Sequence, residues 1–212
     1  MKKEETPMPD NETPAETTAV DEVYSPIGLR AIVVAELLTD VEGSAPTYGA
    51  VQPLVGAIDL DVSDNSGDPD VQYYDDGEHD VVLPDPELSG TIELADLPPE
   101  KQALLLGYKV DNNGVVIHNA DDKPPYFAWG FKSKKSNGVD RYAWYYKGRC
   151  TMPQVKRTTK GKEINRQTQK LKVTFVKLNS TGNARAFVDE DSEDFATAKA
   201  TFFNAPYTPS FT

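Results

Sequence analysis

Carboxylate and amide oxygens gather near the middle of this chain of 212 residues, where they could bind a hard cation such as calcium. The candidate ligands, with the glycine that would turn the loop, are Asp59, Asp61, Asp64, Asn65, Gly67 and Asp68. Their spacing differs from the EF-hand pattern, because no bidentate glutamate closes the loop and no pair of helices flanks it. We therefore interpret the cluster as turn residues and keep calcium binding as an alternative.

The residue types that carry catalysis are isolated from one another in this sequence. His79 and His118 are the only histidines, and each lies in a polar turn or at a strand end without a triad or metal partner nearby. The single cysteine, Cys150, has no second thiol and no neighbouring histidine, so we expect a small, buried strand residue. Nucleophile elbows, P-loops, dinucleotide-binding glycine motifs and zincin pairs are absent. The sequence therefore predicts no enzyme, no cofactor and no metal centre.

Charge is distributed in two blocks of opposite sign. Positions 63–86 are predicted to form a long acidic loop that carries Asp64, Asp68, Asp70, Asp75, Asp76, Glu78, Asp80 and Asp85. Positions 154–167 are predicted to form a basic loop that carries Lys156, Arg157, Lys160, Lys162 and Arg166. Blocks of like charge are usually solvent-exposed loops. Because complementary blocks can also join identical copies head to tail, we hypothesise inter-subunit contacts between these basic residues and Asp64, Asp68, Asp75 and Asp76.

The overall charge and hydropathy argue against several classes of protein. The formal net charge is −12 and the pI is about 4.6, which disfavours a protein that grips nucleic acid over its whole surface. The basic loop also lacks interleaved aromatic residues that would stack on bases. Neither an apolar run long enough to cross a bilayer nor an apolar N-terminal signal is present, so we expect a soluble protein made in a reducing cytoplasm.

The elements that would position these residues are mostly strands of one domain. Positions 1–23 are rich in Pro, Glu and Thr and predict a flexible arm, followed by a β-rich domain over 24–205 and a tail over 206–212. Strands are predicted at 28–39, with a helix as the alternative, and at 54–62, 88–94 and 170–178. In the second strand, Asp59 and Asp61 alternate with Ile58, Leu60 and Val62, the pattern of a strand with one wet face.

Two helices and a small hairpin complete the predicted domain. Prolines at the start and Gly107 at the end predict a helix over positions 97–107. A hairpin is predicted over positions 108–118, with its turn at Asn113 and Gly114. Ser192 is predicted to cap a short helix that presents one face made of Phe195, Ala198, Lys199 and Phe202.

The densest aromatic stretch, positions 124–150, is predicted to be a core hairpin. Asn137 and Gly138 tolerate positive φ and predict a two-residue type I′ turn. That turn pairs Lys135 with Asp140, Phe131 with Trp144, Trp129 with Tyr146, and Gly130 with Tyr145. The aromatic ladder on one face would then need a second layer packed against it. A ligand-binding aromatic platform is the alternative.

Several short blocks, in order along the chain, resemble one protein family. They begin with Gly28-Leu29-Arg30, Leu37-Leu38-Thr39-Asp40, Tyr48-Gly49 and Leu54-Val55-Gly56-Ala57-Ile58. They continue with Tyr74-Asp75-Asp76-Gly77, Leu104-Leu105-Leu106-Gly107, Pro124-Pro125-Tyr126-Phe127-Ala128-Trp129-Gly130-Phe131-Lys132, Asn137-Gly138 and Tyr145-Tyr146-Lys147-Gly148. From about position 24 to 177, the chain resembles the major tail proteins, or tail tube proteins, of phages with long non-contractile tails, especially those of Gram-positive hosts. The Pro/Glu-rich start departs from that pattern.

The resemblance implies a β-sandwich of the tail tube type with one flanking helix. It implies hexameric rings whose inner sheets form a continuous barrel and which stack into a tube that conducts the genome. Positions 1–23, 63–86 and 154–167 would bridge neighbouring copies, and Asp59 and Asp61 would face a lumen that repels DNA phosphates. The implied partners are other copies of the chain and the tape measure, distal tail and tail terminator proteins. The implied location is the tail of a virion, after synthesis in the host cytoplasm.

A binding module is the alternative function from a different class. Trp129, Trp144 and Tyr142 could stack on a sugar, as in carbohydrate-binding or adhesin domains.

Overall fold

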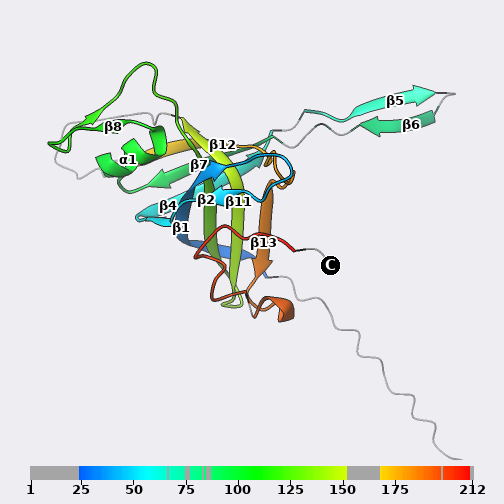
Figure 1. The fold of residues 1–212 in the computed structure, drawn as a ribbon. Coiled ribbons are helices and arrows are strands. Elements are labelled where there is room, and N and C mark those ends of the chain that lie inside the picture. The colour runs from blue at the N-terminus through cyan, green and yellow to red at the C-terminus, as the bar shows by residue number, and fades with distance from the viewer. Residues whose placement is uncertain are drawn as a thin grey trace, which may run out of the picture.

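The protein is mainly β, with a large antiparallel sheet and one α-helix among the residues that the structure describes. The structure, a computed structural model, describes residues 24–65, 67–74, 77–82, 84, 87–151, 168–196 and 198–210 (Figure 1). In chain order the elements are β1 (Pro26–Thr39), β2 (Thr47–Tyr48), β3 (Gln52–Leu54), β4 (Ala57–Asp64), β5 (Asp70–Tyr74), β6 (Gly77–Val82), β7 (Leu88–Leu94), α1 (Pro99–Leu106), β8 (Lys109–Val110), β9 (Val116–Ile117), β10 (Tyr126–Lys135), β11 (Asp140–Thr151), β12 (Gln169–Phe175), β13 (Arg185–Asp189) and the 3₁₀ helix η1 (Glu193–Phe195).

The main sheet divides along the length of β11. Its strand order is β2-β1-β10-β11-β12-β7-β4, and β3 and β13 pair with β1 and β11 beside this path. The first half of β11 pairs with β13, and its last residues, Gly148 to Thr151, pair with β12. The β12–β7–β4 half therefore turns away from the plane of β1, β10 and β13. This division gives the sandwich-like fold that the sequence predicts.

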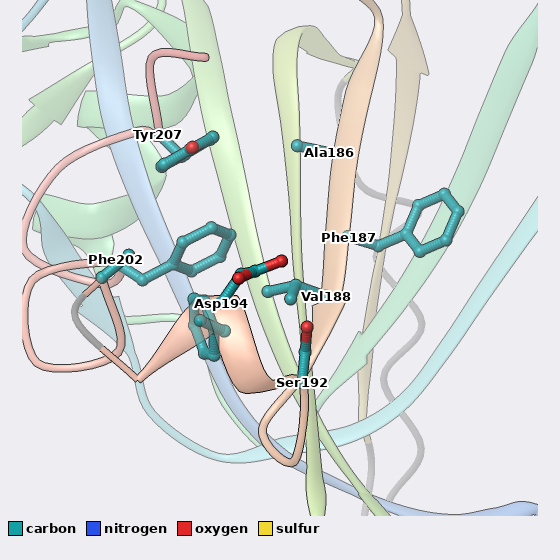
Figure 2. A pocket seen from close by; sticks show the side chains of 9 residues that line it. Ala186, Phe187, Val188, Ser192, Asp194, Phe202 and Tyr207 are labelled. Carbon is teal, nitrogen blue, oxygen red and sulfur yellow. The ribbon is translucent and has the colours of Figure 1, made fainter. Parts of the chain in front are cut away.

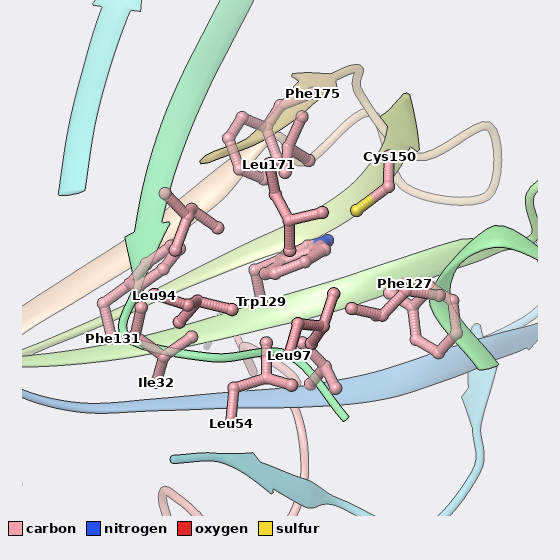
Figure 3. Close-up of a cluster of buried hydrophobic side chains, with 14 of the residues drawn as sticks. Ile32, Leu54, Leu94, Leu97, Phe127, Trp129, Phe131, Cys150, Leu171 and Phe175 are labelled. Carbon is pink, nitrogen blue, oxygen red and sulfur yellow. The ribbon is translucent and has the colours of Figure 1, made fainter. Parts of the chain in front are cut away.

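The inner core lies between these two halves of the sheet. Figure 3 shows Leu171 of β12 close to Trp129 of β10, and Phe175 of β12 and Ile32 of β1 belong to the same cluster of buried side chains. Cys150 belongs to the same cluster, and its burial raises the pKa of the thiol to about 12. The prediction of a small, buried strand residue is thereby confirmed.

A second buried cluster covers the other face of β10 and β11. The side chains of Tyr142, Trp144 and Tyr146 lie on this face, and Phe195 and Phe202 from the C-terminal segment pack against it. Trp144 Nε1 donates a hydrogen bond to the backbone oxygen of Phe202 at 2.8 Å. The central hairpin is therefore buried on both faces, and the inner and outer clusters are separate layers.

The turn of this hairpin lies where the sequence predicts it, but its type is different. The Gly138 N–H donates to the Lys135 oxygen at 3.0 Å, and the Lys135 N–H donates to the Val139 oxygen at 2.8 Å. Gly138 has a φ of 88°, so the loop of Ser136, Asn137 and Gly138 is a type I turn followed by a left-handed glycine. Asn137 Oδ1 accepts the Val139 N–H at 3.1 Å, an Asx contact that supports this longer loop.

This turn shifts the predicted register by one residue. Trp129 lies opposite Tyr145, Gly130 opposite Trp144, Phe131 opposite Ala143, and Lys134 opposite Asp140. Because side chains alternate along a strand, Trp129 and Trp144 lie on opposite faces of the sheet. The predicted single aromatic ladder is therefore wrong. The predicted Lys135–Asp140 pair is also wrong, since Lys135 Nζ binds Asp189 Oδ2 at 2.8 Å and Asp140 Oδ2 binds Lys132 Nζ at 2.9 Å.

Most of the other predicted elements are present, with one change of type. β1, β7, β12 and α1 are confirmed, and α1 ends at Gly107, which has a φ of 72°. The 108–118 hairpin is confirmed, with the Asp111 carboxylate accepting the N–H groups of Asn113 and Val115. The predicted strand over 54–62 is divided into β3 and β4 at Gly56, whose φ is 87°.

The helix predicted after Ser192 is replaced by η1 and a series of turns, and the Ser192 side chain makes no capping hydrogen bond. Phe195 and Phe202 are nonetheless buried, as the predicted shared face requires. Packing of these two rings on the outer layer fixes this segment without a regular helix.

The predicted acidic loop is largely a hairpin. β5 and β6 pair with each other and project away from the body (Figure 1). Val71 follows Asp70 in β5, and Val81 and Val82 follow Asp80 in β6, so β-branched residues favour strands here despite the high charge. We call this projection, Asp70–Val82, the hairpin arm.

Candidate functional site

The surfaces available for binding lie on strands and not in a deep cavity. Three of them carry the functional interpretation: the outward face of β4, β7 and β12, the hairpin arm, and the open edge of β13.

The outward face of the β4–β7–β12 half is polar and carries charges of both signs. Asp59 of β4 lies opposite Glu93 of β7, which lies opposite Lys170 of β12. Glu93 Oε2 is 3.1 Å from Lys170 Nζ, and hydrogen bonds from Thr168 and Lys170 hold the pKa of Glu93 below its usual range. In the next row, Asp61 lies opposite Thr91, which lies opposite Lys172. We call the outward residues of these rows the polar face.

Asp59 and Asp61 are both exposed, which confirms the prediction of one wet face on this strand. The sequence alone did not place Lys170 and Lys172 on the same sheet face as Asp59 and Asp61. Only the β12–β7 register aligns these lysines with the acidic strand. Carboxylates outnumber ammonium groups in the two rows, and the Lys170 charge is offset by Glu93. A phosphate approaching the β4 side of this face meets exposed negative charge.

The hairpin arm exposes apolar as well as acidic side chains. Val81 is 51% exposed and Val82 is 52% exposed. Asp70 and Asp80 are also exposed, and the register places Val82 opposite Asp70. An isolated two-stranded hairpin is marginally stable in water, and this one has no second layer among the described residues. The arm is therefore a strand pair that leaves apolar side chains exposed to solvent.

The residues predicted to join subunits are only partly visible in the structure. Asp64 ends β4 opposite Leu88, and Asp68 is exposed on the way to the arm. Other predicted contact residues lie outside the described residues: Asp75, Asp76, Lys156, Arg157, Lys160, Lys162 and Arg166. Positions 1–23 also lie outside them. The contact between acidic and basic blocks stays a prediction.

The open edge of β13 was missed by sequence reasoning. The Ala184 oxygen accepts from the Tyr146 N–H at 3.1 Å, and the Glu190 N–H donates to the Asp140 oxygen at 2.8 Å. Because antiparallel pairs alternate, Arg185 and Phe187 direct their backbone N–H and C=O groups away from β11. Within the described residues no other strand pairs with this edge. The Phe187 side chain is 66% exposed, an unusual state for an aromatic ring on a sheet.

A shallow groove lies between β13 and the C-terminal turns (Figure 2). Its volume is about 270 Å³, and its apolar lining includes Val188, Phe202 and Tyr207, with Asp194 at its rim. Small-molecule pockets usually enclose roughly 300–1,000 Å³ and bury most of the ligand. This groove is smaller and open, so it does not favour a small-molecule site. Phe187 points away from it, to the other face of β13 (Figure 2).

The aromatic platform required by a carbohydrate-binding module is not formed. Trp129 and Trp144 are both 0% exposed, and Tyr142 is 6% exposed. A ring must present one face to solvent before it can stack on a sugar. These three side chains are therefore packed in the two buried clusters, where they cannot stack on a sugar.

The calcium candidates do not converge on a site. In the part of the chain that the structure describes, no three His, Cys, Asp or Glu side chains are grouped to hold a metal ion. Asn65 Nδ2 instead donates to Ser89 Oγ at 2.5 Å, and the Asn65 N–H donates to the Glu87 oxygen at 2.7 Å. His118 packs against the Tyr108 ring, with centroids 4.5 Å apart.

A buried ion pair joins segments that are remote in sequence. Lys147 Nζ donates to Asp40 Oδ2 at 2.6 Å, and the Asn179 and Ser180 N–H groups donate to the same carboxylate at 3.0 and 2.9 Å. Burial would raise the pKa of Asp40, but these hydrogen bonds outweigh it and lower the pKa to about 2. The pair ties the end of β1 to β11 and to the turn after β12. No local sequence signal predicts it.

No protein-family model matches the chain, and no curated protein matches it. Among the described residues, none of the helices has both the length and the apolar character needed to cross a membrane.

Proposed function

We propose that this protein is the structural subunit of a phage tail tube. Identical copies assemble into hexameric rings, and the rings stack into the conduit through which the genome leaves the capsid. The sequence blocks that resemble tail tube proteins support this proposal, as does the sandwich-like sheet with one helix. The observation that carries it is the hairpin arm, which exposes Val81 and Val82 beyond the body of its own copy.

Assembly in this proposal needs no turnover chemistry. The arm and the open edge of β13 have no pairing strand beyond β5–β6 and β11 among the described residues of one copy, and neighbouring copies in a ring or a stack would cover them. Burial of apolar side chains and strand pairing then supply the driving force. Other tail components, the tape measure, distal tail and tail terminator proteins, limit the length of the tube and close its ends.

The polar face would line the bore of the tube. Exposed carboxylates of Asp59 and Asp61, repeated around each ring, repel the phosphates of a passing duplex. Glu93 offsets the charge of Lys170, so that ammonium group does not hold the DNA. The duplex therefore slides without specific binding, which is the property a conduit requires.

Negative-stain electron microscopy of the purified full chain tests the proposal. The protein is concentrated alone and with the tail components that initiate assembly. Rings or tubes with a central hole are the expected result. A chain that stays a single compact particle under all of these conditions contradicts the proposal.

The predicted contact between the charge blocks has its own test. Reversing the charges of the acidic block or of the basic block alone should abolish assembly, because like charges would face each other. Reversing both blocks in the same chain should restore assembly. Failure of the double reversal, with the folded state intact, would exclude a direct contact between these blocks.

A further inference from the structure

The open edge of β13 presents a cation and an aromatic ring on one side. Arg185 and Phe187 are two positions apart, so their side chains share a face of the strand. The Arg185 guanidinium carbon is 5.8 Å from the centre of the Phe187 ring. Among the described residues Arg185 makes no ion pair, whereas its neighbour Arg141 binds Asp189 at 2.5 Å. A hollow of about 280 Å³ lies beside Phe187 on this face, between Arg185 and Tyr145.

The hairpin arm presents the complementary pair of residue types. Asp80 and Val82 are also two positions apart on one strand, and both are exposed. The β5–β6 register adds Asp70, opposite Val82, to the same face of the arm. This face is thus acidic with one half-exposed valine. When β6 and β13 run in the same direction, the acidic and apolar residues of β6 match the basic and aromatic residues of β13.

We propose that β6 of one copy lies beside β13 of a second copy, with Val82 against Phe187 and Asp80 beside Arg185. The inference rests on the proposed function, because it names the surfaces that two neighbouring subunits share. The occupant is a second copy and not the same chain, since the arm projects away from the body that carries β13 (Figure 1). β6 pairs only with β5 among the described residues, so its outer edge is open to main-chain hydrogen bonds.

Charge supports this choice of partner. The chain has a net charge of −12, so a random encounter between two copies is repulsive. Arg185 is a cation at a strand edge and makes no ion pair within the described part of the chain. The arm would bring the exposed carboxylates of Asp70 and Asp80 to it. Val82 entering the hollow beside Phe187 covers apolar surface on both copies.

Cysteine cross-linking of the full chain tests the contact. The variants Val82→Cys and Phe187→Cys are prepared separately, mixed under conditions that give assembly, and oxidised. The native Cys150 is a silent background, because burial raises its thiol pKa to about 12. The expected result is a cross-linked dimer that contains one copy of each variant. Neither variant should form this dimer alone.

A matched control uses an apolar residue that is equally exposed on another hairpin. Val115 lies beside β9 and is 55% exposed. Mixtures of Val115→Cys with Phe187→Cys should give no more dimer than either variant alone. A chain carrying both Val82→Cys and Phe187→Cys should form a ladder of linked copies. Cross-linking within that single chain, or equal yields for Val82 and Val115, would overturn the proposal.

Charge substitution gives a second readout that does not depend on thiols. Arg185→Glu should raise the protein concentration needed for assembly by about tenfold, a shift of roughly 1.4 kcal/mol. Asp80→Arg in the same chain should reverse this shift. This contact would be refuted if the unmodified protein forms tubes while the cross-link is absent and the Arg185→Glu variant assembles normally. The tube function would then still stand. Unmodified protein that forms neither rings nor tubes would refute both.

Discussion

The central hairpin and the hairpin arm differ in how far one copy of the chain covers them. β10–β11 is packed on both faces, with Trp129 in the inner core and Trp144 in the outer layer. β5–β6 leaves Val81 and Val82 about half exposed. Both are antiparallel hairpins with apolar side chains, so secondary structure does not distinguish them. The difference indicates that the first hairpin stabilises a single copy, and it supports the proposal that the second serves contacts between copies.

Trp129→Ala should give the largest loss of stability. Replacement of a fully buried tryptophan removes its burial and leaves a cavity, at a cost of about 3–5 kcal/mol in the free energy of unfolding. Urea unfolding of the unassembled protein measures the change. Val82→Ala in the arm is the matched control and should change the same free energy by less than about 0.5 kcal/mol. Equal losses of unfolding free energy for the two variants would contradict the difference proposed between the two hairpins.

Acid should weaken the central hairpin through its buried ion pair. The folded pKa of Asp40, about 2, lies below the usual carboxyl value near 3.9, so the stabilisation is complete above about pH 4 and is lost as pH falls towards 2. Its size is about 2 kcal/mol. Asp40→Asn should remove the Asp40 part of the pH dependence and leave the part that comes from Asp189, whose pKa is also lowered to about 2 by its hydrogen bonds from Arg141 and Lys135.

Urea unfolding between pH 2 and pH 7 compares the native chain with the Asp40→Asn variant. Asp80→Asn in the arm serves as the control, because Asp80 is exposed and should leave the pH profile unchanged. A native profile that is flat through this window would contradict the role of the pair.

Deletion of the arm should separate stability from assembly. A short Gly-Ser link in place of positions 70–82 should change the free energy of unfolding by less than about 1 kcal/mol, because none of the arm's described side chains belongs to either buried cluster. The same deletion should abolish rings and tubes in the microscope. A large loss of stability would instead mean that the arm belongs to the body.

The polar face should be the least sensitive region in stability. Asp59→Lys combined with Asp61→Lys should alter the free energy of unfolding by only about 0.5 kcal/mol, because both side chains are exposed. Tubes of this variant should retain DNA at low salt, in a manner that added salt reverses. Glu42→Lys, a change at an exposed turn residue off this face, is the control. Equal retention by both variants would place the polar face outside the bore.

Local signals were sufficient for much of the fold. β7 was predictable because its apolar and polar residues alternate, and α1 because prolines begin it and Gly107 ends it. The wet face of β4 was predictable for the same reason, since Asp59 and Asp61 alternate with apolar residues.

Features that depend on distant partners were not predictable. The register of the central hairpin follows from the Asn137 side chain and from an outer layer in which Trp144 binds Phe202, 58 positions away. Asp40 and Lys147 are 107 positions apart. The open edge of β13 follows from the order of strands in the sheet, and the mixed residues of this short strand do not predict that order. The candidate site therefore became visible only when pairing between distant strands was known.

Hydrogen exchange followed on both hairpins as the protein assembles tests the central claim most directly. Amides of β10–β11 should exchange slowly at every protein concentration. Amides of β5–β6 should exchange rapidly in the dispersed protein and become slow once rings or tubes form. Arm amides that are already slow in the single copy, or that stay fast in the assembled material, would contradict the account.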